Sequence, residues 1–171
     1  MNNDLFTRGL ARASDTKLVE VGRGVLARAG TILHEALFAD GRPALIVADD
    51  RTWAAAAQTV QVALLDAGVG LVEPLIFPGH PVLYAALDNS EVIRERLGET
   101  GALAVAVGSG TINDLVKLAA GDLGEPYAVV GTAASMDGYS GFGAPMSSEG
   151  VKVTMPCPAP TVVLFDLDVA A

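Results

Sequence analysis

Hydrophobic and polar positions along the chain follow two alternating patterns. Short apolar runs bounded by glycine, proline or aspartate predict buried strands, and longer segments with apolar residues three or four positions apart predict helices. The predicted strands cover residues 17–21 (at a sheet edge), 44–48, 71–77, 102–107, 127–130, 151–155 and 161–165. The predicted helices cover residues 24–38, 53–67, 82–97 and 111–120.

This alternation predicts an α/β fold of the Rossmann-like type, with a mostly parallel sheet and flanking helices. We expect one domain over residues 16–171, preceded by a polar N-terminal arm over residues 1–15. Open sheets of this kind bind ligands at the carboxyl ends of their strands. Candidate chemistry is therefore expected directly after strands, at residues 49–50, 78–80, 108–110 and 131–137.

Composition narrows the classes of function. Twenty Asp and Glu against eleven Lys and Arg give a net charge of −9, which argues against a nucleic-acid partner because such a surface needs a basic stripe. A small phosphorylated ligand remains compatible, since N–H groups at a helix start bind phosphate without net positive charge. The apolar runs are far shorter than the roughly 20 residues of a membrane-spanning helix. The single cysteine, Cys157, and a start without an apolar signal segment predict a cytoplasmic protein.

The segment 108–114 (GSGTIND) carries the sharpest local signal. Its glycines, Gly108 and Gly110, allow a tight turn and a close approach to a ligand. A helix starting near Thr111 directs its free N–H groups and positive dipole end at that ligand, which suits a pyrophosphate. A tight strand-to-helix turn without any ligand explains the same residues, and the segment matches neither a Walker A loop nor GxGxxG.

The segment 131–141 (GTAASMDGYSG) follows a predicted strand and consists of small and hydroxylated residues. Thr132 and Ser135 can hydrogen-bond a ligand, and the Asp137 carboxylate can hold a hydroxyl group or a metal-associated water. The alternative is an ordinary polar loop with a turn at Asp137 and Gly138.

Other polar residues have a structural explanation beside the functional one. Asp49 and Asp50 follow the first strong strand, where a carboxylate accepts hydrogen bonds from ribose hydroxyls or caps the next helix. His34 is expected to be structural, and His80, in a loop, has no His or Cys companion at ligand spacing. The residues therefore predict no metal site and no catalytic triad within this sequence.

Taken together, these motifs resemble one family. The segments GSGTINDLVK (108–117) and TAASMDGYS (132–140), with VADDRT (47–52) and the ending VVLFDLDVAA (162–171), resemble the sn-glycerol-1-phosphate dehydrogenases. These belong to the superfamily of iron-containing alcohol dehydrogenases and dehydroquinate synthase. The resemblance implies a dehydroquinate synthase-like N-terminal domain and a place in phospholipid metabolism. It also implies reduction of dihydroxyacetone phosphate to sn-glycerol 1-phosphate by NADH or NADPH, with a divalent zinc or nickel ion as Lewis acid.

The resemblance also assigns roles to residues. It implies that the dinucleotide pyrophosphate lies at Gly110, Thr111, Ile112, Asn113 and Asp114, and that Asp49 lies near the adenosine ribose. It implies that the nicotinamide lies beside Thr132, Ala133, Ala134 and Ser135, and that Asp137 contacts the substrate, a small phosphorylated polyol. Gly141 stands where the family usually has serine, which leaves one cofactor contact unexplained.

The family's metal ligands, an aspartate and two histidines of a C-terminal helical domain, are absent from this sequence. We therefore expect the chain to be the cofactor-binding half of a larger enzyme, with weak cofactor affinity and no activity alone. Asp49 and Asp50 favour NAD slightly over NADP, because they repel a 2′-phosphate. A face meant for a second domain would favour self-association into a homo-oligomer.

Three alternatives remain open from the sequence. The first is another polyol or alcohol dehydrogenase, or a dehydroquinate synthase-like enzyme, of the same superfamily. The second is a lipid kinase-like or NAD kinase-like domain, although Ser109 stands where those proteins carry aspartate. The third is a non-catalytic binding module. Binding of ATP without binding of NAD would favour the kinase-like domain.

Overall fold

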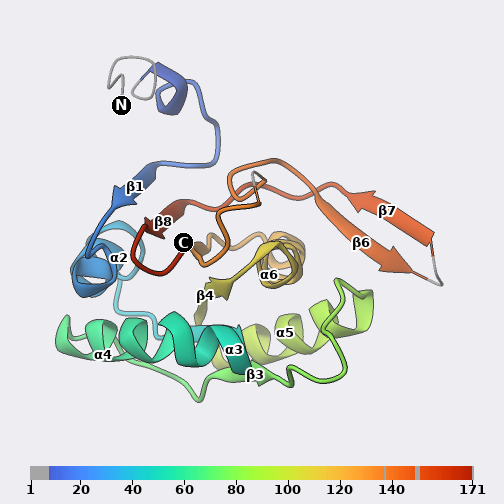
Figure 1. Cartoon of the computed structure of the whole chain (residues 1–171), viewed down its shortest axis with the longest axis horizontal. Coiled ribbons are helices and arrows are strands. Elements are labelled where there is room, and N and C mark those ends of the chain that lie inside the picture. The colour runs from blue at the N-terminus through green and yellow to red at the C-terminus, as the bar shows by residue number, and fades with distance from the viewer. Residues whose placement is uncertain (1–7, 137, 149–150, 171) are drawn as a thin grey trace.

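The computed structural model describes residues 8–136, 138–148 and 151–170. They form a six-stranded parallel sheet in the order β1-β8-β5-β4-β2-β3 (Figure 1). Its strands are β1 (Leu18–Gly22), β2 (Ala44–Asp49), β3 (Leu75–Phe77), β4 (Leu103–Gly108), β5 (Ala128–Gly131) and β8 (Val162–Asp166). The predicted α/β fold is confirmed, and β1 lies at the sheet edge as expected.

Helices cover both faces of this sheet. On one face pack α2 (Ala29–Leu37), the short 3₁₀ helix η1 (Leu26–Arg28) and a continuous helix made of α3 (Asp50–Thr52), the π-helical η2 (Trp53–Ala57) and α4 (Gln58–Asp66). On the other face pack α5 (Leu87–Thr100) and α6 (Gly110–Leu123). Successive side chains of a strand point to opposite faces, and helices bury both faces. A central strand is therefore apolar at every position. This accounts for uninterrupted apolar runs such as residues 44–48.

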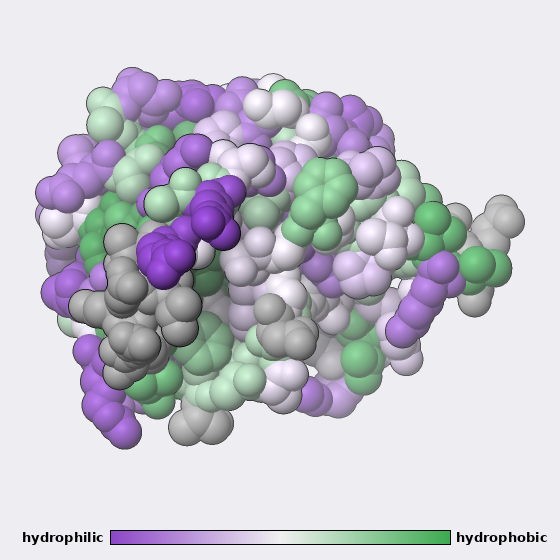
Figure 2. All heavy atoms as spheres, turned by 90° about the horizontal axis from the view of Figure 1, so that it is seen from above, coloured by the Kyte–Doolittle hydropathy of each residue, from purple (hydrophilic) through white to green (hydrophobic). Residues whose placement is uncertain are grey.

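A separate antiparallel hairpin lies outside the sheet. It consists of β6 (Ala144–Ser148) and β7 (Val151–Met155), and it extends from the body of the molecule (Figure 1). The strand predicted at 151–155 is confirmed, but β6 was not predicted, because Pro145 interrupts its pattern. Hydrophobic residues are exposed on the hairpin (Figure 2), including Val151 and Val153 of β7.

Several element boundaries differ from the predicted ones. The strand expected at 71–77 is reduced to β3, preceded by Pro74, which cannot donate to a ladder; Leu71 makes only an isolated bridge with Ala44. The helix expected at 82–97 is α5, which begins only at Leu87, continues through Gly98 and ends at Thr100, before Gly101, whose φ is 64°. The long helix begins at Asp50 rather than residue 53.

Two expectations concern the chain as a whole. Residues 8–10 form a helical turn of the expected arm, of which residues 1–7 lie outside the described part. In the described residues, no helix is long and apolar enough to cross a membrane.

Candidate cofactor site

The carboxyl ends of the inner strands meet at one edge of the sheet. In the sheet register Gly108 of β4 lies opposite Gly131 of β5, and Gly131 lies opposite Phe165 of β8. From β2 the chain first adds β3 on one side and later returns to place β4 on the other. The gap between the ends of β2 and β4 is therefore the topological switch point, where open sheets bind their ligands.

Helix α6 begins at this point with unsatisfied backbone donors. Its N-cap residue, Ser109, has an extended backbone, and its side chain caps no N–H group. The first hydrogen bond of the helix runs from Asn113 N to Ser109 O over 3.1 Å. The N–H groups of Gly110, Thr111 and Ile112 thus have no carbonyl partner inside the helix, and together with the dipole they form a candidate anion-binding site.

A glycine is required at the turn that leads into α6. A Cβ atom on Gly108 would lie 2.7 Å from the Cβ of Ile112, which is fixed in the core. At Gly110 the restriction is weaker, because an added Cβ would meet only the flexible end of the Met136 side chain, at 2.9 Å. The helix start therefore approaches the end of β4 more closely than any side chain at position 108 would allow.

The structure divides the five predicted pyrophosphate residues into two groups. Gly110, Thr111 and Asp114 line cavities at the sheet edge. The side chains of Ile112 and Asn113 are fully buried, and the Asn113 amide oxygen accepts a hydrogen bond from the Tyr127 hydroxyl at 3.1 Å. Ile112 can therefore offer a ligand only its backbone, and the N–H of Asn113 is already bonded to Ser109 O.

Asp49 has the capping role that the sequence left open. Its Oδ1 accepts hydrogen bonds from the N–H groups of Arg51 (2.9 Å) and Thr52 (2.8 Å), and its own N–H donates to the Thr52 hydroxyl at 3.0 Å. The same residue lines a cavity of about 170 Å³. The other lining residues are Arg51, Gly79, Val82, Leu83, Ser109 and Thr111. The cap thus holds Asp49 beside the start of α6.

A second cavity, of about 430 Å³, lies on the other side of Thr111 and contains an ion pair that the sequence analysis missed. Lys117 Nζ lies 3.7 Å from Asp114 Oδ1, and it donates hydrogen bonds to the carbonyl oxygens of Gly141 (2.9 Å) and Gly143 (3.1 Å). A lone lysine in the otherwise apolar run LVKLAA was the signal that could have found it.

Burial changes the acidity of both groups of this pair. It raises the pKa of the Asp114 carboxyl to about 6, although the charge of Lys117 opposes the shift. Burial likewise lowers the pKa of the Lys117 amine, and Asp114 opposes that shift. Lys117 is only 1% exposed. A cation this deeply buried requires its carbonyl partners, so it ties α6 to residues 141–143.

The segment after β5 is held by Tyr139. Its hydroxyl accepts a hydrogen bond from Ala133 N at 3.2 Å and lies 3.3 Å from the carbonyl oxygens of Gly108 and Ala133, to which it can donate. Thr132 N donates to Gly108 O at 3.1 Å. Ala134 and Ser135 are exposed, and neither of the two cavities is lined by residues 132–135. Asp137 lies outside the described residues.

Gly141, the position where the family usually has serine, contributes its backbone. Its carbonyl oxygen accepts from Lys117, and its N–H donates to Gly138 O at 3.2 Å. These contacts do not depend on the side chain at position 141.

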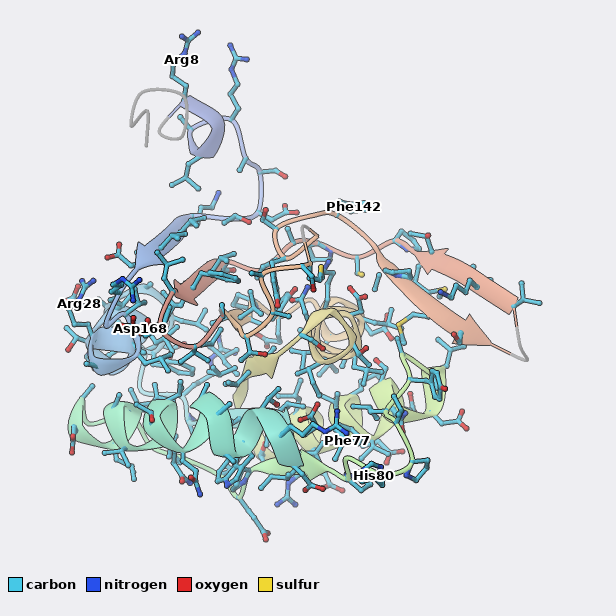
Figure 3. The ribbon with its side chains drawn as sticks, in the orientation of Figure 1. Arg8, Arg28, Phe77, His80, Phe142 and Asp168 are labelled. Atoms are coloured by element: carbon cyan, nitrogen blue, oxygen red, sulfur yellow. The ribbon has the colours of Figure 1, made fainter. Side chains whose placement is uncertain are left out.

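The carboxylates near the end of β8 have a structural role. Asp166 accepts hydrogen bonds from the N–H groups of Gly24, Leu26 and Asp168. Burial alone would raise the pKa of this carboxyl, but these hydrogen bonds hold it below the usual value. His34 is half-buried in α2, and His80 is exposed after β3 (Figure 3). Across the described ranges, no three His, Cys, Asp or Glu side chains are grouped so that they could hold a metal ion.

Known proteins share this sequence pattern and fold. The family model described as iron-containing alcohol dehydrogenase matches residues 20–171. The chain is 37% identical over 126 residues to a glycerol-1-phosphate dehydrogenase [NAD(P)+] of Halalkalibacterium halodurans, which covers 72% of this chain and 31% of that protein. It is 32% identical over 154 residues to a protein of the same name from Methanococcoides burtonii, covering 90% of this chain and 41% of the relative. The chain thus spans well under half of these relatives.

Solved structures show the same fold at lower identity. Glycerol dehydrogenase of Schizosaccharomyces pombe superimposes with a TM-score of 0.76 at 19% identity, over 92% of this chain and 39% of that one. A 2-epi-5-epi-valiolone synthase of Streptomyces hygroscopicus, solved with NAD+ and Zn2+ bound, superimposes with a TM-score of 0.66 at 20% identity, over 86% of this chain and 42% of that one. From the family match and the sequence relatives, we conclude that this chain belongs to the iron-containing alcohol dehydrogenase family.

Proposed function

We propose that residues 16–171 form the NAD(P)-binding unit of a dehydrogenase that interconverts dihydroxyacetone phosphate and sn-glycerol 1-phosphate. The observation that carries the proposal is the uncapped start of α6 at the switch point of the sheet, beside the capped carboxylate of Asp49. The names of the sequence relatives support the reaction and the choice of substrate. The resemblance in the motifs 108–117 and 132–140 supports it independently of overall identity.

The two cavities suggest how the dinucleotide lies across the sheet edge. The pyrophosphate would receive hydrogen bonds from the N–H groups of Gly110, Thr111 and Ile112. The adenosine ribose would occupy the smaller cavity, where Asp49 Oδ2 is free of the helix cap, which uses Oδ1. The nicotinamide would extend past Thr111 toward residues 132–136 and the larger cavity, with Asp137 at the substrate.

The chemistry of hydride transfer belongs to the nicotinamide, which gives or accepts the hydride when bound. The residues of this chain bind and orient it. The family's divalent metal, which we propose to be zinc or nickel, finds no suitable group of ligands among the residues described here. We therefore assign it no contact with this chain.

We extend the proposal to the substrate class, the partners and the cellular location of the protein. The substrate class is a small phosphorylated polyol, and the acidic net charge of −9 argues against a nucleic-acid partner. We place the protein in the cytoplasm, because a single cysteine suits a reducing compartment. We also propose a homo-oligomer, since an apolar face meant for a second domain would favour self-association.

The proposal is tested by titrating the 171-residue chain with NADH and monitoring binding by nicotinamide fluorescence. The informative variant is Thr111→Glu, which places a carboxylate in the first turn of α6, where both cavities meet. A negative charge there stabilises the helix but repels the pyrophosphate. We expect the Kd for NADH to rise at least about tenfold while the melting temperature is maintained, since about 1.4 kcal/mol of lost binding corresponds to that factor.

The control variant is Thr59→Glu, which adds the same charge on the exposed surface of α4. It should leave the Kd for NADH unchanged. Equal weakening by both variants, or binding of ATP without binding of NADH, would contradict the proposed function, and the second outcome would favour the kinase-like alternative.

A further inference from the structure

The cavity beside Asp49 is also lined by an arginine that the proposed cofactor contacts leave unused. Arg51 lines this cavity together with Asp49, Ser109 and Thr111. Its backbone N–H donates to Asp49 Oδ1, which places the residue directly beside the carboxylate assigned to the ribose. Figure 3 shows Phe77 at the end of β3 and His80 on the segment that follows, and Gly79 of that segment also lines the cavity.

The guanidinium of Arg51 forms no ion pair with either of the two carboxylates, Asp49 and Asp50, that precede it in sequence. Asp49 uses Oδ1 for the N–H groups that begin the helix, and Asp50 Oδ2 accepts from Gly79 N at 2.8 Å. Both carboxylates therefore hold backbone, and neither forms an ion pair with Arg51. Other arginines of the described residues do pair with carboxylates, as Arg28 does with Glu20 and Arg42 with Glu125.

The chemistry of the adenosine ribose explains what such an arginine can recognise. NAD carries a 2′-hydroxyl at this ribose, which donates well to a carboxylate, whereas NADP carries a 2′-phosphate, which a carboxylate repels and an arginine attracts. The planar guanidinium binds phosphate oxygens through two parallel hydrogen bonds. A cavity that offers Asp49 and Arg51 side by side contains a group for each cofactor.

We propose that Arg51 is a specificity residue that pairs with the 2′-phosphate of NADP and so lets this chain bind NADP as well as NAD. The assignment rests on the proposed function, since it places the adenosine ribose in the cavity beside Asp49. It reduces the preference for NAD that Asp49 and Asp50 alone would impose.

The test compares two cofactors that differ only at the 2′ position. NADH and NADPH are titrated separately into the unsubstituted chain and into Arg51→Gln and Arg51→Lys, with nicotinamide fluorescence as the readout. For Arg51→Gln the Kd for NADPH should rise about tenfold or more, while the Kd for NADH stays within about twofold. Arg51→Lys should give an intermediate Kd for NADPH, because lysine retains the charge but not the paired hydrogen bonds.

A matched control separates local pairing from net charge. Arg12→Gln removes the same charge at an exposed arginine that does not line this cavity, and both Kd values should stay unchanged. Competition against bound NADH by 2′,5′-ADP and by 5′-AMP isolates the same contact, since the two competitors differ by one phosphate. Only 2′,5′-ADP should lose affinity in Arg51→Gln.

The outcomes distinguish this inference from the proposed function. If NADH and NADPH lose affinity equally in Arg51→Gln, or if neither changes, the assignment of Arg51 is wrong while cofactor binding stands. If the unsubstituted chain binds neither cofactor, the proposed function fails and the assignment fails with it. Circular dichroism of each variant, together with its retained affinity for NADH, identifies any loss of fold.

Discussion

Tyr139 shows how one side chain organises the segment that follows β5. Its ring packs edge-on against Phe165 at a centroid distance of 5.8 Å, and its hydroxyl lies between the end of β4 and Ala133. Gly131 permits this arrangement, because a Cβ there would lie 2.7 Å from Phe165 and 2.9 Å from Tyr139. The absence of a side chain at position 131 thus serves the packing of this tyrosine.

Removing this hydroxyl should destabilise the fold measurably. In Tyr139→Phe the N–H of Ala133 loses its acceptor, and leaving a partly buried donor unpaired costs about 1–3 kcal/mol. We expect the free energy of unfolding in urea to fall by that amount. Tyr84→Phe is the control, because Tyr84 is 68% exposed, and it should change stability by less than about 0.5 kcal/mol. Equal stability of the two variants would contradict this role for the hydroxyl.

The buried Asp114 should make stability depend on pH. Its folded-state pKa of about 6 lies above its ordinary value of 3.8. Between these values the folded chain retains a proton that the unfolded chain has lost. The contribution of this group to stability is therefore complete below about pH 4 and is lost as pH rises through 6.

The variant Asp114→Asn removes this titration and retains the shape of the side chain. The free energy of unfolding of the unsubstituted chain minus that of Asp114→Asn should fall between pH 4 and pH 7. The fall should be at most about 3 kcal/mol, since each pKa unit corresponds to 1.36 kcal/mol. Urea titrations at several pH values measure this difference. A difference that stays constant or grows with pH would show that Asp114 is not destabilised by burial.

At the scale of elements, α2 and α4 approach each other closely at Gly30. A Cβ on Gly30 would lie 1.8 Å from the carbonyl oxygen of Ala63, so only glycine lets the helices pack at this distance. Gly30→Ala forces the backbones apart, and overpacking of this kind costs about 1–3 kcal/mol. We expect a lower melting temperature in thermal unfolding followed by circular dichroism.

Another helical glycine provides the opposite case. Gly98 lies inside α5, with nothing within 4 Å of an added Cβ. Gly98→Ala should therefore raise stability by about 0.5–1 kcal/mol, because alanine loses less backbone entropy in a helix. If both variants shift stability in the same direction, the packing explanation for Gly30 is wrong.

The elements also show which features a sequence pattern can predict. The inner strands were found because burial on both faces produces uninterrupted apolar runs, and α6 because its turn contains Gly108 and Gly110. The hairpin partner β6 was missed, since Pro145 and serines hide its alternation. The length of α5 was misjudged because Gly98, which looks like a helix end, is followed by Gly101 with the positive φ that ends the helix.

The candidate site was predictable for its backbone and less so for its side chains. The helix start and Asp49 follow from local order along the chain. The partners of Lys117 are carbonyl oxygens of residues 141 and 143, which a hydrophobicity pattern does not reveal. The sequence did not single out Arg51, because an exposed arginine in a helix is ordinary and its proposed role depends on the hydrogen bond between Asp50 and Gly79 N.

On the scale of the whole molecule, stability should be distributed unevenly. Strands β4, β5 and β8 are paired on both sides and almost fully buried, whereas β7 pairs only with β6 and is largely exposed. Amides of the inner strands should exchange with solvent only on global unfolding, and those of β7 through local opening that requires much less free energy. Hydrogen exchange detected by mass spectrometry resolves the two classes.

Adding NADH to the same experiment tests the position of the proposed site without measuring activity. A ligand that binds only the folded chain stabilises it by about 2.7 kcal/mol at one hundred times its Kd. Segments in direct contact should gain further protection, and we expect this at 109–113 and 132–136, the segments that the proposal places against the cofactor. The exposed β7 should not gain it, because local opening there leaves the proposed contacts intact. Extra protection confined to β6 and β7, with none at the start of α6, would place the cofactor elsewhere on the molecule.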